Sequence, residues 1–308
     1  MPLVPFRQLM ADAETGGYAV GYFESWNLES LQAVVDAAEA TASPVILGFS
    51  GLNLPDPRRH PPERLELYAA LGRAAAESAR VPAALLFNES PDVDWVEQAI
   101  DQGFNLVMFA DGHLSPDELR ARVQQTVARA RGRAAVEAEM AALPGVASGL
   151  DARPDSLELT DPDLAAAFVA ETSVDALAVS IGNVHLHGRQ RAYLDLARLR
   201  AIRARVPVPL VLHGGTSIAD DDLRAAIDAG IRKINVGSAL RSAFYRAVQQ
   251  RVETTGNDFN PYQVLGSGLE ADVLTAGRTA MRDLIVEKMR LFGSAGRGKV
   301  GAMKGSEG

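Results

Sequence analysis

Residues Ala83–Phe109 read AALLFNESPDVDWVEQAIDQGFNLVMF, and the fold class can be inferred from this segment. The short apolar runs at its two ends, 83–87 and 106–109, are typical of buried strands. The segment between them, 93–102, has the apolar spacing of an amphipathic helix. A strand, a helix and a second strand in such close succession indicate a unit with two parallel strands.

The same alternation extends outward to both ends of the chain. The predicted strands are Tyr18–Phe23, Val45–Phe49, Ala83–Phe87, Leu106–Phe109, Ala135–Glu139, Ala176–Ile181, Leu210–His213 and Lys233–Val236. The predicted helices are Leu28–Thr41, Pro62–Ala79, Val93–Gln102, Pro116–Arg131, Asp161–Glu171, Leu194–Arg205 and Ala219–Ala229. Eight such units without a linker predict an α/β protein with a single-domain (β/α)8 TIM barrel, rather than an open doubly wound sheet. We expect this barrel and its C-terminal helices over residues 1–292, and a mobile tail over 293–308, which contains six glycines.

Composition narrows the functional classes. The 31 Lys and Arg residues against 39 Asp and Glu residues give a net charge of −8, which argues against nucleic acid or an anionic membrane as partner. The absence of cysteine excludes disulfides, thiolate nucleophiles and Cys-type zinc sites, so that any metal must bind His, Asp, Glu or Asn. No apolar run approaches the ~18 residues of a membrane span, and the first residues lack the pattern of a signal peptide. We therefore expect a cytoplasmic protein.

Polar residues gather where the predicted strands end. In a (β/α)8 barrel the chemistry lies at the carboxyl ends of the strands and in the loops that follow them. Four of the five histidines fall in this set, which is more than an inert barrel face needs. The residues at these positions are Glu24, Asn27, Ser50, Asn88, Glu89, Asp111, His113, Glu137, Glu139, Asn183, His185, His187, His213, Gly214–Ser217, Asn235 and Ser238.

An ordered series of segments gives the chain a family resemblance. These segments are YAVGYF with Asn27, GFNLVMFADGHL at 103–114, VEAEM at 136–140, ALAVSIGNV followed by His185, PLVLHGGTSI with His213, GIRKINV at 230–236 and MRLFGSAGR at 289–297. In this order they resemble the class II (metal-dependent) fructose-bisphosphate and tagatose-bisphosphate aldolase family over residues 18–297. The resemblance implies a TIM barrel in which three histidines hold zinc or a similar divalent ion, and chemistry through an enediolate.

The resemblance also implies the metal ligands. His185 and His213 match two of the three family histidines, and His187 is an alternative to His185 if the loop is shifted. The third family histidine follows a catalytic aspartate, and this chain has Asn88 and Glu89 at that Asp-His pair. Because a carboxylate oxygen can also bind a metal, we expect Glu89 to be a ligand. The carboxylate shifts the preferred ion from Zn towards Mn, Mg, Co or Fe without excluding Zn.

A further carboxylate and the missing acid leave alternatives open. Glu139 is either a ligand or a carboxylate that supports the ligands, as in the family, or a buried ion-pair partner. Asn88 stands at the catalytic position but cannot exchange a proton as aspartate does. Glu24 and Asp111 are therefore the predicted proton-transfer groups, although Asp111 could instead cap the helix that starts near Pro116.

Family members hold a substrate phosphate in small-residue loops after strands 6, 7 and 8. This chain has Leu186 in place of the strand-6 glycine, so that a phosphorylated substrate is not secured. Small residues and hydroxyls let backbone N–H groups approach an anion. The substrate contacts that the resemblance implies are Asn27, Ser50, Gly214, Gly215, Thr216, Asn235, Ser238 and Arg282.

The predicted function is a metal-dependent class II aldolase that cleaves or forms a carbon–carbon bond of a ketose or related hydroxy-ketone, phosphorylated or not. One alternative is an isomerase, epimerase or decarboxylase that uses the same metal site, because the Asn88–Glu89 exchange removes the group suited to an aldehyde product. Another is a degenerate sugar-binding protein without catalysis. Soluble barrels of this family pair into homodimers or homotetramers, and we expect the same here.

Overall fold

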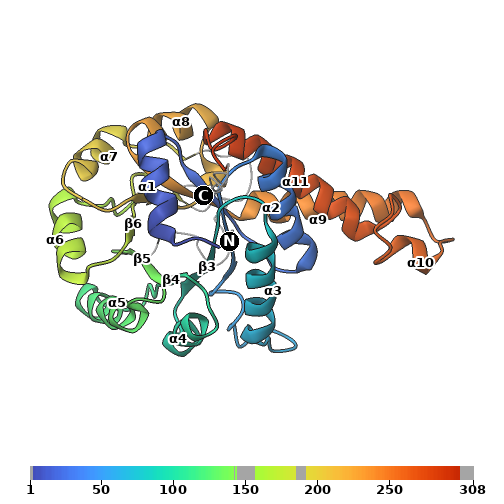
Figure 1. Ribbon diagram of the computed structural model, residues 1–308, viewed down its shortest axis with the longest axis horizontal. Coiled ribbons are helices and arrows are strands. Elements are labelled where there is room, and N and C mark those ends of the chain that lie inside the picture. The colour runs from blue at the N-terminus through green and yellow to red at the C-terminus, as the bar shows by residue number, and fades with distance from the viewer. Residues whose placement is uncertain (1–2, 142, 144–156, 185–191, 299–308) are drawn as a thin grey trace, which may run out of the picture.

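The computed structural model describes residues 3–141, 143, 157–184 and 192–298. Eight parallel strands close into a barrel in the order β1-β2-β3-β4-β5-β6-β7-β8, as the sequence predicted (Figure 1). The strands are β1 Val20–Phe23, β2 Val45–Ser50, β3 Ala83–Ser90, β4 Leu106–Phe109, β5 Ala135–Glu139, β6 Ala176–Ala178, β7 Leu210–Leu212 and β8 Ile231–Val236.

Helices follow the strands and form the outer layer (Figure 1). They are α2 Leu28–Thr41, α3 Leu65–Ser78, α4 Val93–Asp101, α5 Pro116–Ala130, α6 Pro162–Thr172, α7 Leu196–Arg203, the 3-10 turn η1 Gly215–Ser217, α8 Asp220–Asp228, α9 Ser238–Thr255, α10 Pro261–Val264 and α11 Val273–Leu291. Local signals set several starts, since Asn27 caps α2 and Ser115, followed by a proline, caps α5.

The sequence analysis missed one helix, α1 Phe6–Gly16, which lies across the amino-terminal end of the barrel (Figure 1). Its apolar face, which includes Phe6, Leu9 and Met10, is buried and joins the cluster of side chains inside the barrel. This cluster closes the end of the barrel opposite to the carboxyl ends of the strands. The carboxyl ends are therefore left for polar side chains.

The strands are buried on both faces, because helices cover the outside and side chains fill the inside. Apolar residues such as Ile46, Ala84 and Leu86 fill the lower interior. The upper interior instead holds buried polar residues, namely Asn88, Glu89, Glu137, Glu139, His213, Lys233 and Asn235.

The C-terminal helices extend away from the barrel as an arm made of α9, α10 and α11 (Figure 1). After α11, residues 293–298 pack against the end of α2: the N–H of Gly296 donates to the carbonyl of Thr41 at 2.8 Å, and Ser294 is fully buried. The first part of the predicted mobile tail is therefore fastened to the barrel by backbone hydrogen bonds, and residues 299–308 lie outside the described part. Within the described ranges, no helix combines the length and apolar character that crossing a membrane requires.

Candidate metal centre and active site

The end of β3 brings two neighbouring side chains into the barrel. β3 continues three residues beyond the predicted strand, and its pairing with β4 shifts between Phe87 and Ser90. Glu89 has a φ of 54°, in the left-handed region that side-chain-bearing residues rarely adopt. Successive strand residues normally point to opposite faces, but here both Asn88 and Glu89 contact the same buried cluster. Such local strain is concentrated at functional sites.

His213 follows β7 directly and is held at both ring nitrogens. Its Nδ1 lies 3.0 Å from Glu89 Oε1, and its Nε2 lies 2.9 Å from Glu137 Oε1. Glu137 in turn is paired with the fully buried ammonium of Lys233, whose Nζ lies 2.8 Å from Oε2 and 3.1 Å from Oε1. The imidazole is therefore fixed between the carboxylates of Glu89 and Glu137, and the ammonium group of Lys233 neutralises the charge of Glu137.

A second chain of hydrogen bonds runs from Lys233 back to Glu89. Lys233 donates to Asn235 Oδ1 at 2.5 Å, Asn235 Nδ2 donates to Asn88 Oδ1 at 3.4 Å, and Asn88 Nδ2 donates to Glu89 Oε2 at 2.5 Å. Because an ammonium group can only donate, Lys233 determines which way both amides point. The two chains form a closed polar ring of six buried residues: Lys233, Glu137, His213, Glu89, Asn88 and Asn235.

Charges in this cluster shift one another's pKa values. Burial alone would lower the pKa of His213, but the carboxylates of Glu89 and Glu137 raise it to about 10. Burial, reinforced by the nearby Glu89 carboxylate, raises the pKa of Glu139 to about 8. Burial also opposes ionisation of Glu137, yet Lys233 and His213 hold the pKa of this carboxyl below its usual value.

Three of these side chains fit a divalent cation. One ligand atom each from Glu89, Glu139 and His213 lies within 4.8 Å of the other two, and all three residues are buried. Glu139 Oε2 is buried without a hydrogen-bond partner among the described residues. Two carboxylates and an imidazole in this arrangement suit a divalent ion. The positive charge of the ion would offset the repulsion between the Glu89 and Glu139 carboxylates.

Other predicted residues lie at the carboxyl ends of β2, β7 and β8 or just after them. Ser50 lies at the end of β2, paired in register with Asn88. Gly215 and Thr216 lie in η1, and the hydroxyl of Thr216 accepts a hydrogen bond from Ala239 N at 3.2 Å. Ser238 begins α9. His185, Leu186 and His187 lie outside the described residues.

Four predicted residues have local partners. Asn27 accepts from Ser30 N at 2.9 Å and so caps α2, and Arg282 donates to its neighbour Asp283 on the exposed side of α11. Asp111 accepts from His113 N at 2.9 Å within its own loop, whereas Ser115 caps α5. Glu24 accepts from Arg241 Nη2 at 2.5 Å at the rim of the barrel.

Sequence reasoning missed Lys233 of the polar ring, and it placed Glu137 among the strand-end polar residues without giving it a role. The available signal was a charged residue inside an apolar strand run, as in KINV and AVEAE. A charge that is buried in a strand needs a partner on a neighbouring strand.

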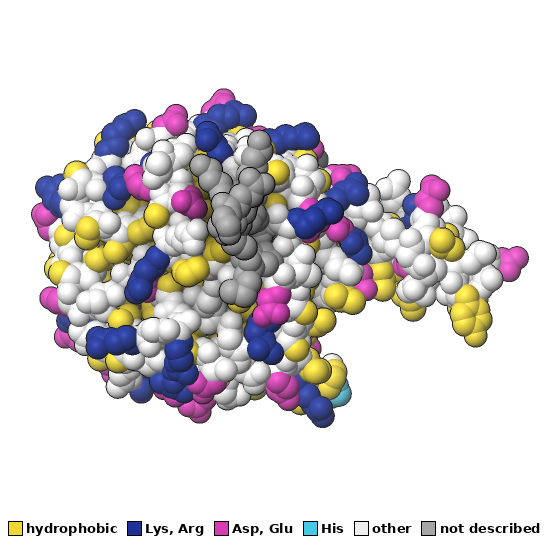
Figure 2. Space-filling model, viewed as in Figure 1, with side chains coloured by type: hydrophobic (Ala, Val, Ile, Leu, Met, Phe, Trp, Pro, Cys, Tyr) yellow, Lys and Arg dark blue, Asp and Glu magenta, His cyan; other side chains and the backbone are white. Residues whose placement is uncertain are grey.

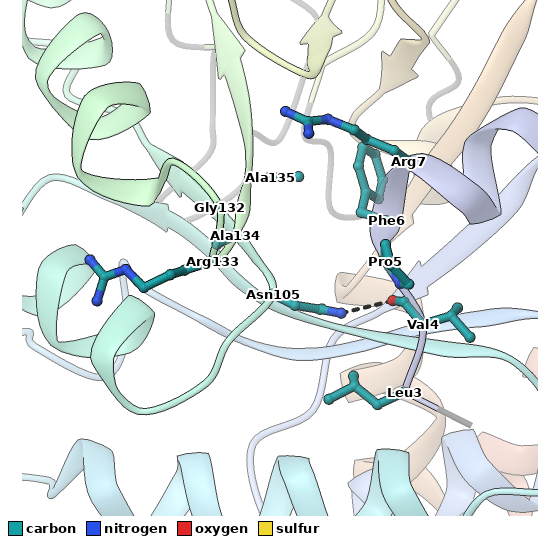
Figure 3. A pocket seen from close by; sticks show the side chains of 10 residues that line it. All are labelled: Leu3, Val4, Pro5, Phe6, Arg7, Asn105, Gly132, Arg133, Ala134 and Ala135. Atoms are coloured by element: carbon teal, nitrogen blue, oxygen red, sulfur yellow. Dashed lines mark hydrogen bonds between the residues drawn. The ribbon is translucent and has the colours of Figure 1, made fainter. Parts of the chain in front are cut away.

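A cavity of about 330 Å³ lies at the opposite end of the barrel, between the N-terminal segment and the start of β5 (Figure 3). Its polar side chains already have partners: Asn105 donates to the carbonyl of Val4, Arg7 pairs with Asp175, and Arg133 pairs with Asp101. Catalysis in this fold occurs at the carboxyl ends of the strands. The polar ring, and not this cavity, is therefore the candidate active site.

Comparisons with known proteins identify the family of the chain. The family model described as fructose-bisphosphate aldolase class-II matches residues 4–297. Fructose-bisphosphate aldolases of Geobacillus stearothermophilus and Thermus caldophilus are 33% and 32% identical, and each alignment covers 96% of this chain and 99% of the relative.

Solved structures give the same result. The YdjI aldolase from Escherichia coli K12 is 30% identical with a TM-score of 0.79, over 96% of this chain and 99% of that one. The fructose-bisphosphate aldolase from Campylobacter jejuni is 18% identical with a TM-score of 0.75, over 96% and 97% of the two chains, and supports the fold alone. The chain therefore belongs to the class II fructose-bisphosphate aldolase family, a family of aldehyde-lyases.

Proposed function

We propose that this protein is a metal-dependent aldolase that cleaves or forms a carbon–carbon bond of a ketose or hydroxy-ketone through an enediolate. The observation that carries the proposal is the buried convergence of Glu89, Glu139 and His213, whose ligand atoms lie within 4.8 Å of one another. These three residues, with His185, which lies outside the described residues, would hold the ion. When bound, a divalent ion supplies a Lewis acid that lowers the barrier to forming a carbanion beside a carbonyl group.

The ion is proposed to be Zn or, because two carboxylates harden the site, Mn, Mg, Co or Fe. The family contains enzymes that depend on divalent metals, and the Glu/Glu/His cluster supports the same dependence here. Glu137 contributes by fixing the His213 ring so that Nδ1 faces the other ligands.

Proton exchange with the substrate is assigned to Asp111. Asn88 cannot exchange a proton, and its amide is engaged with Glu89 and Asn235. Glu24, the second predicted group, is ion-paired with Arg241 through Oε1, which favours its ionised form and makes it a weak proton donor. Asp111 is half-buried in the loop after β4 and uses only one carboxylate oxygen, in its contact with His113 N. We expect Asp111→Asn to lower kcat by at least roughly 100-fold, the usual contribution of a general acid or base, whereas the surface variant Glu253→Gln leaves kcat unchanged.

The decisive experiment strips the metal and reloads the protein with Zn, Mn, Mg, Co or Fe. Each form is assayed for aldehyde released from a panel of ketoses and ketose phosphates. We expect metal-dependent release that is lost in Glu89→Gln and His213→Ala and is kept in the surface control Glu253→Gln at the far end of α9. Full activity in both site variants would contradict the proposal.

One observation favours a second function. Asn88 stands at the position where the family has its acid, so that the site stabilises an enediolate without that proton donor. An isomerase, epimerase or decarboxylase also passes through an enediolate or enolate and still exchanges protons with it, but it releases no aldehyde and so does not need an acid at that end of the substrate. Product analysis separates the two functions, because an aldolase gives a shorter aldehyde and the alternatives do not.

The arm supports a homo-oligomer. Between the end of α9 and the start of α11 the side chains of Phe259, Tyr262, Leu265 and Leu269 are more than half exposed, and hydrophobic side chains are visible on the arm in Figure 2. Exposed apolar clusters of this kind are typical of interfaces. We propose that a second copy of the chain covers them in a homodimer or homotetramer.

A further inference from the structure

The loops after β7 and β8 form a cradle of small residues beside the polar ring. A Cβ atom on Gly215 would lie 2.8 Å from Ile234 Cγ2 and 3.0 Å from the carbonyl oxygen of Asn235, so that only glycine fits against β8. The 18-residue helix α9 begins beside it at Ser238. Small-residue loops beside the positive end of a helix suit an anion.

The carboxylate of Glu24 already lies beside this cradle. The backbone of Glu24 is bonded to the end of β8 through the carbonyl of Val236. Its carboxylate Oε2 stands only 2.5 Å from the place where a Cβ on Gly237 would lie, so that the side chain occupies the space in front of α9. Its other oxygen accepts from Arg241 at 2.5 Å and from Asn53 at 3.4 Å.

The partner of Glu24 is itself held in place. The Arg241 guanidinium lies 4.7 Å from the centre of the Trp26 ring, and Trp26 packs edge-on against Phe244 at 5.6 Å. Because the arginine is stacked and paired, its charge is already used within the protein. A second anion at the start of α9 would be repelled by the Glu24 carboxylate. Arg241 would not compensate for this repulsion, because it is already paired with Glu24.

Two residues earlier in β1, Tyr22 offers a free donor. Its hydroxyl is buried and has no hydrogen-bond partner among the described residues, and Lys233 Nζ lies 5.3 Å from the centre of its ring. Burial raises the pKa of Tyr22 well above its usual value, and Glu24 and Glu89 add to this effect. The hydroxyl thus remains protonated, and the charges of Glu24 and Glu89 act on it. A buried unpaired hydroxyl is costly unless a ligand satisfies it.

We propose that Tyr22 and Glu24 form a subsite on β1 that selects a substrate without phosphate at the end that reaches α9. In this subsite Glu24 accepts hydrogen bonds from substrate hydroxyl groups and Tyr22 donates one. The substrate class is an unphosphorylated polyhydroxy-ketone, and the like charge of Glu24 excludes a phosphate ester. This inference rests on the proposed aldolase function and specifies its substrate.

The first experiment compares dihydroxyacetone with dihydroxyacetone phosphate as donors, using a fixed set of aldehyde acceptors and the metal-loaded enzyme. We expect kcat/KM to favour dihydroxyacetone by at least roughly tenfold, since like charges at a binding site cost this much or more. Glu24→Gln should shift the ratio towards the phosphate by a similar factor, while Glu253→Gln leaves it unchanged. A preference of the wild type for the phosphate, or a ratio that Glu24→Gln does not move, would overturn the inference.

The second experiment does not depend on turnover. The unfolding temperature of each protein is measured with rising concentrations of inorganic phosphate, and sodium chloride matches the ionic strength. We expect no phosphate-specific rise for the wild type, a rise for Glu24→Gln because Arg241 is released, and loss of that rise in the double variant with Arg241→Met. If no donor is turned over with any metal, the proposed aldolase function fails, but the role of Glu24 can still be tested by the thermal assay. A phosphate-specific rise in the unfolding temperature of the wild type would refute that role.

Discussion

Glu137 Oε1 lies 2.9 Å from His213 Nε2, while Lys233 holds the same carboxylate from below the site. This contact leaves Nδ1 as the only ring nitrogen of His213 that can face Glu89 and a metal. A carboxylate that orients a ligating histidine in this way raises the basicity of the imidazole and fixes its tautomer. The polar ring thus prepares the ligand geometry before any ion binds.

Replacement of Lys233 by methionine tests this arrangement. The change leaves the Glu137 carboxylate buried without its cation, and we expect a loss of about 3–5 kcal/mol in the free energy of unfolding. Metal affinity, measured by calorimetry, should fall roughly 10- to 100-fold, because Glu137 no longer holds His213 in place. The control is Lys288→Met, which breaks a surface pair with Asp220. Recovery of stability in the Lys233→Met, Glu137→Gln double variant would confirm that the unpaired charge causes the loss of stability. An unchanged metal affinity in Lys233→Met would contradict the role of Glu137 in positioning His213.

Metal uptake should release protons. Near neutral pH the raised pKa values, about 8 for Glu139 and about 10 for His213, keep both groups protonated in the metal-free protein. A metal can bind only after these protons leave, so the apparent affinity should increase with pH between 6 and 8. Calorimetry in buffers of different ionisation enthalpy counts the protons released. Glu139→Gln should release about one proton fewer per ion. An affinity independent of pH would refute this model.

The barrel and part of the site were predictable from the sequence because their signals are local. The run LVMF at Leu106–Phe109 and the run AVEAE at Ala135–Glu139 give strands with the predicted bounds. His213 and Glu89 were proposed as ligands from their place at strand ends and from the family resemblance, and the structure brings both into one buried cluster. The helix α1 was missed because its apolar face packs against side chains inside the barrel, and this contact can be recognised only once the barrel is known.

The polar ring could not be predicted, because it depends on which residues meet across the barrel. Lys233 and Glu137 are 96 residues apart in the chain, and neither β8 nor β5 contains a local sign of the other. The inward turn of Glu89 likewise depends on a backbone conformation that β propensity disfavours. Strand periodicity alone would place this side chain on the outer face of the barrel.

The arm offers a prediction about assembly. If a second copy covers the exposed side chains near α10, a charged residue there should weaken the association. Tyr262 is 88% exposed, so its replacement leaves the fold of the monomer intact. We expect Tyr262→Asp with Leu265→Asp to lower the molar mass in light scattering, with little change in circular dichroism. The control pair Gln249→Asp with Glu253→Gln lies on the same arm, and an equal effect of both pairs would refute the assignment.

The contact between Asn88 and Glu89 predicts how the altered family motif responds to mutation. Asn88 Nδ2 donates to Glu89 Oε2 at 2.5 Å, and Asn88→Asp replaces this donor by a second carboxylate. Two buried carboxylates in contact cannot both ionise, so that the single variant should lose about 1–3 kcal/mol of stability and bind metal more weakly at neutral pH. The double variant Asn88→Asp, Glu89→His restores the Asp-His pair of the family, and its imidazole removes the repulsion.

We therefore expect a strong coupling between the two positions. Thermal unfolding and metal titration of both single variants and the double variant form a double-mutant cycle, and the coupling should exceed the roughly 0.5 kcal/mol within which independent sites add. The matched control cycle uses Asp94→Asn and Glu97→Gln on α4, where both residues are exposed. Additive effects at positions 88 and 89 would show that the amide of Asn88 does not act through Glu89. A large coupling would instead show that the two substitutions at the family's Asp-His pair form one functional unit.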